Sequence, residues 1–343
     1  MDNLRRAILL FTVIVFTAAA VTGFMAALDY YDASKSVIKD IEFSGEKYVP
    51  PEGETSDDNK EELLKYNILF IIGDKNVKSS EIISVMNYDE ESKKISTLYI
   101  PCDTKYSLNS GNGGVANGAL RDCYSLYGGE QTTLILSGMM DINISKYVYM
   151  DYENFASFVN HFTSRDSGVE FELPVAINYT DNNGNKVSLR AGKQFFDGNA
   201  AKQLAMFCTT DDGIYDAELL KYYDGTQTGR IRIMSIFTES FIEQKIIDPQ
   251  ETYYSENFYS LLYSVKSGCE TNITDSELLS LSQGIAEFKK GCTDFYRIIC
   301  EDETGSGKFC IYTKTCCVAG GDGSEFLDEA ETSLLYKNNF NSN

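Results

Sequence analysis

The sequence predicts an α/β domain, layered α/β/α with a central mixed sheet flanked by helices, preceded by one transmembrane helix. Three observations support this. Short, continuous apolar runs predict strands that are buried on both faces. Segments with apolar residues at helical spacing alternate with these runs, which is the order of elements in α/β layers. A single long apolar stretch without charge lies close to the N-terminus.

Residues 1–28 predict a membrane anchor. Arg5 and Arg6 precede an apolar run, Ala7–Leu28, that contains no charged residue. As a helix this run spans roughly 33 Å, which is enough to cross a bilayer. Basic residues on its N-terminal side predict a cell-membrane protein with a single pass, a cytoplasmic N-terminus and an extracytoplasmic C-terminal domain. A cleaved signal peptide is the alternative, because residues 17–20 are small, but the length of the run favours an uncleaved anchor.

The folded domain is expected to follow a spacer. Residues 29–65 are charged and are broken by Pro50-Pro51, which is typical of a linker between a membrane and a domain. The apolar runs begin immediately afterwards, so we expect the domain to cover residues 66–318. Three strands are expected first, and a polar hairpin turn at residues 88–92 is expected between the second and the third. The three strands expected here are Asn67–Ile72, Ile82–Met86 and Lys94–Ile100.

The middle of the domain alternates helices with further strands. Helices are expected at 114–126 and 130–140, with Gly128 and Gly129 separating them. Thr274 is expected to be the N-cap of the last clear helix. The other expected elements are a strand at 147–150, a helix at 151–162, strands at 169–174, 176–179 and 186–189 around a hairpin turn, and helices at 198–207, 229–247 and 275–289. The tail, residues 319–343, is rich in Gly, Asp and Asn and is expected to be flexible.

Charge and cysteine content limit the possible functions. A net charge of -21 argues against nucleic-acid binding, which requires basic surface, so we expect no nucleic-acid partner. Nine cysteines cannot all pair within one exported chain. The cysteines between Cys292 and Cys317 have no C-x-x-C spacing and the only histidine, His161, is distant in sequence, so a zinc site is not expected. One or two disulfides there, or reduced thiols in an anaerobic cell, are both compatible with the sequence.

Several familiar catalytic motifs are missing. A Ser-His-Asp hydrolase is not expected in a chain with one histidine and no G-x-S-x-G. Residues 305–309 lack the length and the Ser/Thr of a phosphate-binding P-loop. Residues 181–186 begin like a calcium loop but have no glycine at the sixth position and no acid at the twelfth, so a hairpin turn is the better interpretation.

Polar residues at the ends of buried elements remain as candidates. Asp74 follows the first expected strand and Asp103 follows the third, while Arg230 and Arg232 begin a helix. Carboxylates at adjacent strand ends can hold a magnesium ion, and guanidinium groups bind phosphate oxygens bidentately. Aspartates at strand ends also commonly only cap turns, so that alternative stays open.

The order of motifs resembles the LytR-CpsA-Psr family of cell-envelope proteins. The relevant residues are the run from Asn67 to Asp74, NILFIIGD, and then Ile100-Pro-Cys-Asp-Thr104. In that family an apolar strand leads into Asp and is followed by Arg-Ser-Asp-Thr, Pro-Arg-Asp-Thr and a later Gly-Arg-x-x-Arg-Gln. Further matching stretches extend the resemblance over roughly residues 66–290. They are 117–119, 127–130, 147–155, 189–198 and 269–279.

The resemblance implies a phosphotransferase that moves a glycopolymer from a polyprenyl-pyrophosphate carrier to peptidoglycan. It also implies Mg²⁺ as the cofactor and an apolar cavity for the lipid tail between sheet and helices. Asp74 and Asp103 are then the magnesium ligands and catalytic carboxylates. The phosphate-binding role falls on the cationic residues Arg230, Arg232, Lys78 and Lys105.

This chain departs from the family motifs at positions that should bind phosphate. Lys78 and Ser80 stand where the family has the arginine and aspartate of Arg-Ser-Asp-Thr, and Glu81 would replace the missing acid only if the turn shifts. Cys102 stands at the arginine of Pro-Arg-Asp-Thr, so it is not expected to be a nucleophile. Ile233 falls on the second arginine of the late motif. Each lost charged contact costs about 1.5–3 kcal/mol, so the second hypothesis is a catalytically degenerate relative that binds a lipid carrier or partner proteins.

Overall fold

The structure, a computed structural model, describes most of the expected domain. The described residues are 65–109, 115–140, 142–163, 168–181, 184–207, 227–247, 252–285, 288, 292–300 and 309–313. The expected anchor (1–28), nearly all of the spacer and the tail (319–343) lie outside these residues. Within the described ranges, no helix combines the length and the apolar character needed to cross a bilayer.

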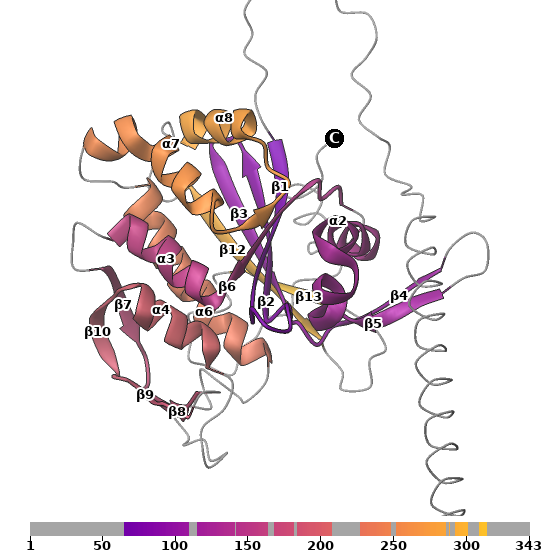
Figure 1. The fold of residues 1–343 in the computed structure, drawn as a ribbon, viewed down its shortest axis with the longest axis horizontal. Coiled ribbons are helices and arrows are strands. Elements are labelled where there is room, and N and C mark those ends of the chain that lie inside the picture. Colours follow the sequence, from indigo (N-terminus) through magenta and orange to yellow (C-terminus); the bar gives the residue numbers. More distant parts are fainter. Residues whose placement is uncertain are drawn as a thin grey trace, which may run out of the picture.

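A seven-stranded mixed sheet forms the centre of the domain, in the order β11-β6-β1-β2-β3-β12-β13 (Figure 1). The three expected strands form an antiparallel meander in its middle, while β6 pairs parallel to β1 and β12 pairs parallel to β3. The sequence did not predict β11, β12 and β13. The strands are β1 (Lys65–Gly73), β2 (Ile82–Asp89), β3 (Lys94–Ile100), β6 (Lys146–Asp151), β11 (Glu270–Thr271), β12 (Thr293–Cys300) and β13 (Phe309–Thr313).

Strand β1 shows why a continuous apolar run makes a central strand. Successive side chains of a strand point to opposite faces of the sheet. Ile68 and Ile72 therefore belong to the core on one face, whereas Leu69 and Ile71 belong to the core on the other. All four are buried. A strand covered on both faces is apolar at successive positions, as predicted, and the one buried polar side chain of β1, Asn67, is hydrogen-bonded.

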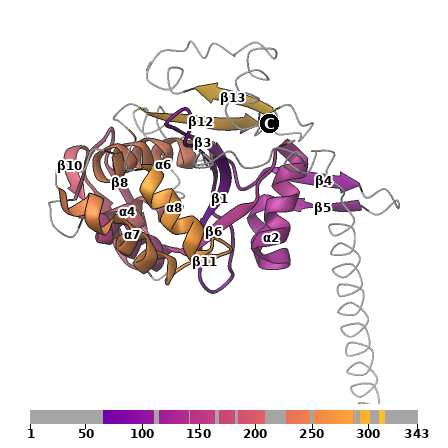
Figure 2. The same cartoon turned by 90° about the horizontal axis from the view of Figure 1, so that it is seen from above.

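Helices cover both faces of the sheet, which confirms the predicted mixed sheet flanked by helices (Figures 1 and 2). Among the described residues, helix α2 packs on one face and five helices pack on the other. The sequence did not predict α7, and the expected helix 229–247 is an α-helix continued by a π-helix. The five are α3 (Tyr152–Thr163), α4 (Gly198–Met206), α6 (Gln227–Phe241) with its π-helical extension η1 (Ile242–Ile247), α7 (Thr252–Lys266) and α8 (Asp275–Ile285).

The helix expected from residue 114 was wrong in its first part. Residues Val115–Ala119 form strand β5, which pairs antiparallel with β4 (Lys105–Asn109), and α2 is Leu120–Met140. Pairing with β4 gives these backbone groups hydrogen-bond partners in an extended conformation. The expected break at Gly128 is confirmed, because its φ of 76° lies in the left-handed region that glycine adopts without strain.

Smaller features match the turn and cap predictions. Strand β8 (Ile177–Thr180) pairs with β9 (Lys186–Leu189) across a turn in which Asp181 Oδ1 accepts the Asn185 N–H at 2.8 Å. The expected strand at 169–174 is β7 (Val169–Leu173), paired with an unpredicted strand, β10 (Gly192–Phe196). Thr274 caps α8 in a capping box, since its N–H donates to Glu277 Oε2 at 2.9 Å and its Oγ1 accepts the Glu277 N–H at 3.3 Å.

Candidate functional site

The C-terminal ends of three strands meet at one edge of the sheet. Because β2 is antiparallel to both β1 and β3, these two strands run in the same direction, and β6 is parallel to β1. The segments that follow them therefore emerge together, with Asp74 after β1, Asp103 after β3 and Tyr152 after β6. Ligands of open α/β sheets commonly bind at this edge.

The loop after β1 folds back sharply because it begins with glycine. A Cβ on Gly73 would lie 1.7 Å from the Ser79 carbonyl oxygen, so no larger residue fits there. Asp74 Oδ1 accepts the backbone N–H groups of Asn76 at 2.7 Å and Val77 at 3.2 Å. Asp74 therefore caps this turn, which is the alternative role that its position in the sequence had left open.

Backbone hydrogen bonds fix the start of α2 between two loops of the site. The Ser80 N–H donates to the Arg121 carbonyl at 2.8 Å, and the Arg121 N–H donates to the Cys102 carbonyl at 2.8 Å. The Leu120 N–H donates to the Thr104 carbonyl at 3.0 Å. These bonds hold Arg121 near the C-terminal ends of the strands. No sequence motif had indicated Arg121 as a site residue.

Arg230 lies in a buried group that we call the closed cluster, formed with Glu81 and Tyr152. Its side chain is almost inaccessible, and NH1 donates to Glu81 Oε2 at 2.9 Å. NH2 donates to the Tyr152 hydroxyl and to the Ala205 carbonyl, both at 2.6 Å, and Nε donates to the same carbonyl at 3.0 Å. Burial favours protonation of Glu81, but Arg230 and the Ser79 hydroxyl hold the pKa of Glu81 below its usual value. Glu81 is therefore an ion-pair partner of Arg230.

Arg121, Asp103 and Cys102 form a second group, the open cluster. Arg121 NH2 lies 2.7 Å from Asp103 Oδ1 and 3.3 Å from Cys102 Sγ. The Arg121 side chain is 38% exposed and that of Asp103 is 61% exposed, so solvent reaches this ion pair. Burial raises the pKa of the Cys102 thiol to about 11, although Arg121 opposes the change. Cys102 therefore stays protonated at neutral pH and is a poor nucleophile, as expected.

Lys78 forms a third contact at the border of the site. Its Nζ lies 2.7 Å from Glu270 Oε1, and both side chains are about half exposed. The Tyr124 hydroxyl donates to Glu270 Oε2 at 2.7 Å. The hydrogen bond from Lys78 holds the pKa of Glu270 below its usual value. Lys78 thus places a positive charge near the C-terminal ends of the strands, where it pairs with the Glu270 carboxylate of β11.

Two other positions on α6, the predicted phosphate-binding residue Arg232 and the motif departure Ile233, differ from Arg230 in orientation or residue type. Arg232 is two residues after Arg230 on α6, so the helix turns its side chain by roughly 200° away from that of Arg230. Ile233 is buried and packs in the hydrophobic core, so the position of the family's second arginine is apolar here. The side chain of Lys105 lies outside the described part of the structure.

The carboxylates suit only one kind of magnesium site. Among the described residues, no three His, Cys, Asp or Glu side chains converge on a point where they could hold a metal ion. Mg²⁺ is commonly held by one or two carboxylates together with substrate phosphates and waters. The contacts of Asp74 and Asp103 given above use Oδ1, which leaves Oδ2 of each carboxylate for such an ion. The carboxylate oxygens are chemically suitable ligands for a magnesium ion that a substrate also binds, but the described residues form no protein-only cage.

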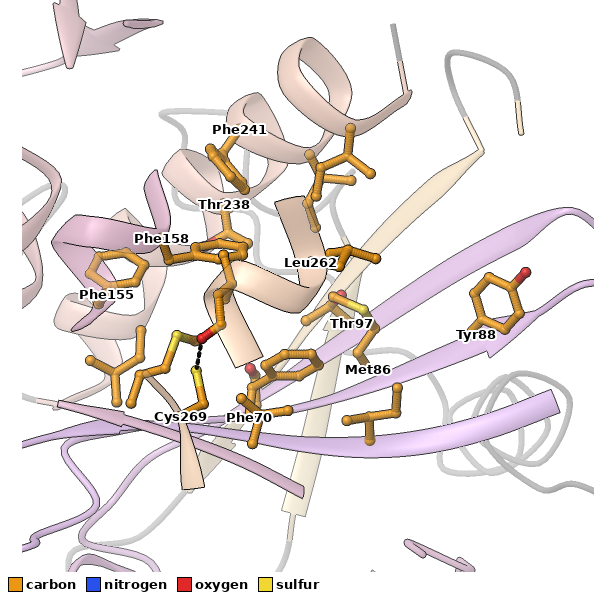
Figure 3. A pocket seen from close by; sticks show the side chains of 18 of the residues that line it. Phe70, Met86, Tyr88, Thr97, Phe155, Phe158, Thr238, Phe241, Leu262 and Cys269 are labelled. Carbon is orange, nitrogen blue, oxygen red and sulfur yellow. Dashed lines mark hydrogen bonds between the residues drawn. The ribbon is translucent and has the colours of Figure 1, made fainter. Parts of the chain in front are cut away.

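An apolar cavity of about 200 Å³ lies between the sheet and the helices on its α6–α8 side. Figure 3 shows its walls, with Phe70 and Met86 from the sheet opposite Phe158, Phe241 and Leu262 from the helices. A few polar residues, among them Thr97 and Thr238, also line it.

The cavity reaches the edge of the sheet that carries the ionic clusters. Ile72 and Ile82 both line it, and they flank the loop that contains Asp74 and Glu81. Apolar space and charged groups therefore lie next to each other, which suits an amphiphilic ligand with a long apolar part and an anionic head.

Comparison with known families identifies this architecture. The profile of the LytR_cpsA_psr family matches residues 31–313. The chain belongs to this family. Members of the LytR_cpsA_psr family attach cell-wall glycopolymers to peptidoglycan. No curated protein matches the sequence of this chain significantly.

Solved structures share the LytR_cpsA_psr fold at low sequence identity. TagV of B. subtilis has a TM-score of 0.56 and 16% identity, covering 81% of this chain and 98% of its own. The LytR-Csp2A-Psr enzyme of Actinomyces oris has a TM-score of 0.54 and 16% identity, with 81% and 90% covered. TagT, solved bound to LI-WTA, has a TM-score of 0.52 and 15% identity, with 84% and 98% covered. At these identities the likeness establishes the fold.

Arg121, Tyr124, Tyr152 and Glu270 are site residues that the sequence did not reveal. Arg121 had one weak signal, since it lies two residues after the family-like stretch Asn117–Ala119, at the start of a helix. The others become recognisable only when the strand ends are brought together in space.

Proposed function

We propose that this LytR_cpsA_psr protein binds a polyprenyl-pyrophosphate-linked glycopolymer and transfers the polymer to peptidoglycan. The supporting observation is the apolar cavity that reaches the loop of Asp74 and Glu81, at the same end of the sheet as Asp103 and Arg121. A polyprenyl chain is apolar and its pyrophosphate is anionic, so one ligand would satisfy both regions. The predicted N-terminal anchor would hold the domain beside a donor that is itself in the membrane.

The reaction requires one bond to form and one to break at phosphorus. A hydroxyl oxygen of peptidoglycan bonds to the phosphorus next to the polymer, and the bond from that phosphorus to the lipid phosphate oxygen breaks. The hydroxyl proton passes to a carboxylate, for which Asp103 is the candidate because it is exposed at the edge. A magnesium ion, held by Asp74 and Asp103 together with the substrate, would offset the negative charge on the phosphates. The lipid monophosphate then leaves.

A transfer assay tests this proposal. The full-length chain in lipid vesicles is given Mg²⁺, a lipid-linked glycopolymer and peptidoglycan, and released polyprenyl phosphate is measured. We expect Asp103→Asn to lower the rate by about 10²–10⁴-fold, the usual contribution of a positioned proton acceptor. Glu172→Gln is the matched control, since Glu172 is exposed on β7. An intact protein without any transfer would contradict the proposed reaction.

A second candidate function is carrier binding without catalysis. It is favoured by the closed cluster. Arg230, which matches the first arginine of the late family motif, already donates hydrogen bonds to Glu81 and Tyr152 there. Together with the changes at Ser80 and Ile233, this leaves fewer groups to bind the reacting phosphates.

The absence of tryptophan offers a direct test of carrier binding. Met86→Trp introduces a single tryptophan into the cavity, which can be excited selectively over the 23 tyrosines, and a polyprenyl phosphate should change its emission. Met139→Trp is the control, because Met139 packs on the opposite face of the sheet. A change in emission without transfer would support carrier binding alone. No change with either variant would contradict both candidate functions.

A further inference from the structure

The start of helix α2 places a guanidinium group where this chain has lost one. Arg121 NH2 lies 3.3 Å from Cys102 Sγ, which is the side chain at the arginine position of the family's Pro-Arg-Asp-Thr motif. The two residues are 19 positions apart in sequence. The backbone bond from the Arg121 N–H to the Cys102 carbonyl, at 2.8 Å, keeps them together.

Arg121 is only partly engaged within the protein. NH2 contacts Asp103 and Cys102, whereas the buried Nε has no hydrogen-bond partner among the described residues. Ser80 Oγ, which is completely buried, also lacks a partner there. The Ser80 N–H donates to the Arg121 carbonyl, so the two residues that carry these unmatched side-chain donors are neighbours. A buried donor without an acceptor is unfavourable, and an anionic ligand would supply acceptors.

Of the arginines in the closed and open clusters, Arg121 is the one that solvent can reach. Arg230 is closed by Glu81, Tyr152 and a carbonyl, whereas about a third of the Arg121 side chain is exposed. Cys102 remains an uncharged thiol and does not neutralise Arg121. Asp103 is the one carboxylate in direct contact with it in the described structure, and it occupies a single NH2 group.

We propose that Arg121 binds a phosphate oxygen of the substrate and so takes the place of the arginine that Cys102 has replaced. This inference rests on the proposed function, because it requires a substrate with phosphate groups at the strand edge. On this proposal, a guanidinium group from the start of α2 does the work that the family motif assigns to a guanidinium group at the end of β3.

Binding of two prenyl probes tests the proposal on the full-length chain in nanodiscs. Farnesyl pyrophosphate, with Mg²⁺, carries the phosphates, and farnesol lacks them. We expect Arg121→Ala to weaken farnesyl pyrophosphate binding by about 10- to 100-fold, as for loss of a charged hydrogen bond. Farnesol binding should not change. Arg121→Lys keeps the charge but loses the planar guanidinium group, so its affinity for farnesyl pyrophosphate should lie between those of Arg121→Ala and the original protein.

Two further variants provide the control and the rescue. Arg190→Ala removes an exposed arginine of the β9–β10 turn and should leave both affinities unchanged. Cys102→Arg combined with Arg121→Ala returns the guanidinium to the family position and should restore farnesyl pyrophosphate binding to within about threefold of the original protein. Unfolding midpoints measured alongside confirm that each variant is folded.

The outcomes separate the two proposals. Binding of farnesyl pyrophosphate that is equal in Arg121→Ala and the original protein would overturn the role of Arg121 and leave the proposed function standing. An original protein that binds neither probe would overturn the proposed function and Arg121 with it. Equal weakening for both probes would show that Arg121 only maintains the structure, which also overturns its role.

Discussion

Two arginines at the same edge of the sheet have opposite environments. Arg230 is buried, and its NH1, NH2 and Nε all donate to groups of the protein. Arg121 is partly exposed, pairs with an exposed carboxylate and keeps one donor unmatched within the described structure. The first environment is that of a residue that stabilises the fold, and the second is that of a residue that can bind a ligand. A match to a family motif did not distinguish between these roles, because it pointed to Arg230.

The largest expected effect on stability comes from opening the closed cluster. Arg230→Ala leaves Glu81 and the Ala205 carbonyl without their buried partner, and breaking such a pair typically costs about 3–5 kcal/mol. Urea denaturation of the full-length chain in detergent measures this difference, with Arg190→Ala as the exposed control. A loss below about 1 kcal/mol, the scale of an exposed ion pair, would show that the two arginines do not differ in the way described.

A smaller and pH-dependent effect is expected for Glu81→Gln. Loss of a charged hydrogen bond costs about 1–3 kcal/mol. Because the folded-state pKa of Glu81 is lowered, its stabilising contribution is present above the unfolded pKa, near 4.5, and is lost as the pH falls through the folded value. The stability of the two proteins should therefore differ at pH 7 and converge in acid. A difference that stays constant from pH 7 to pH 3 would contradict the ion pair.

Arg121→Ala should have little effect on stability, in contrast to its effect on binding. The Arg121–Asp103 pair is exposed to solvent, and pairs of this kind contribute about 0–1 kcal/mol. Thermal unfolding without ligand measures this contribution. If Arg121→Ala destabilised the protein as much as Arg230→Ala, the open cluster would have to be reinterpreted as part of the structural core.

The smallest effect is expected at the Lys78–Glu270 pair, where both side chains are about half exposed. Lys78→Ala should change the free energy of unfolding by less than about 0.5 kcal/mol, and 0.5 M salt should abolish the difference. Thermal unfolding at low and high salt provides the comparison. A salt-independent loss would indicate that Lys78 packs as part of the fold.

The sheet was largely predictable because burial on both faces leaves a clear pattern. The runs around Ile68, Ile83 and Leu98 identified β1, β2 and β3, and the glycine pair identified the break in α2. Residues Val115–Ala119 were misassigned because their conformation depends on pairing with β4, which is a tertiary contact. Helix α7 was not recognised, although Phe258 is part of the core and several other residues of the helix, among them Leu262, pack against it.

The site was less predictable because its chemistry depends on distances that spacing does not encode. Asp74, Asp103 and Arg230 are at the strand edge, as their positions suggested. Sequence alone could not show that Glu81 pairs with Arg230 across 149 positions, or that Arg121 lies beside Cys102. The first contact requires α6 to pack beside the loop between β1 and β2, and the second requires the start of α2 to bond to the segment after β3.

The cavity on one face of the sheet has a mechanical consequence. Empty volume inside a folded protein is eliminated on unfolding, so hydrostatic pressure favours states in which that space is filled by water. The side with α6, α7 and α8 carries a partly open apolar cavity of about 200 Å³, and any part of it that water does not enter makes this side sensitive to compression. Under the proposed function, a lipid tail in the cavity would fill this space and add packing contacts between the sheet and these helices, so the domain would become stiffer on binding.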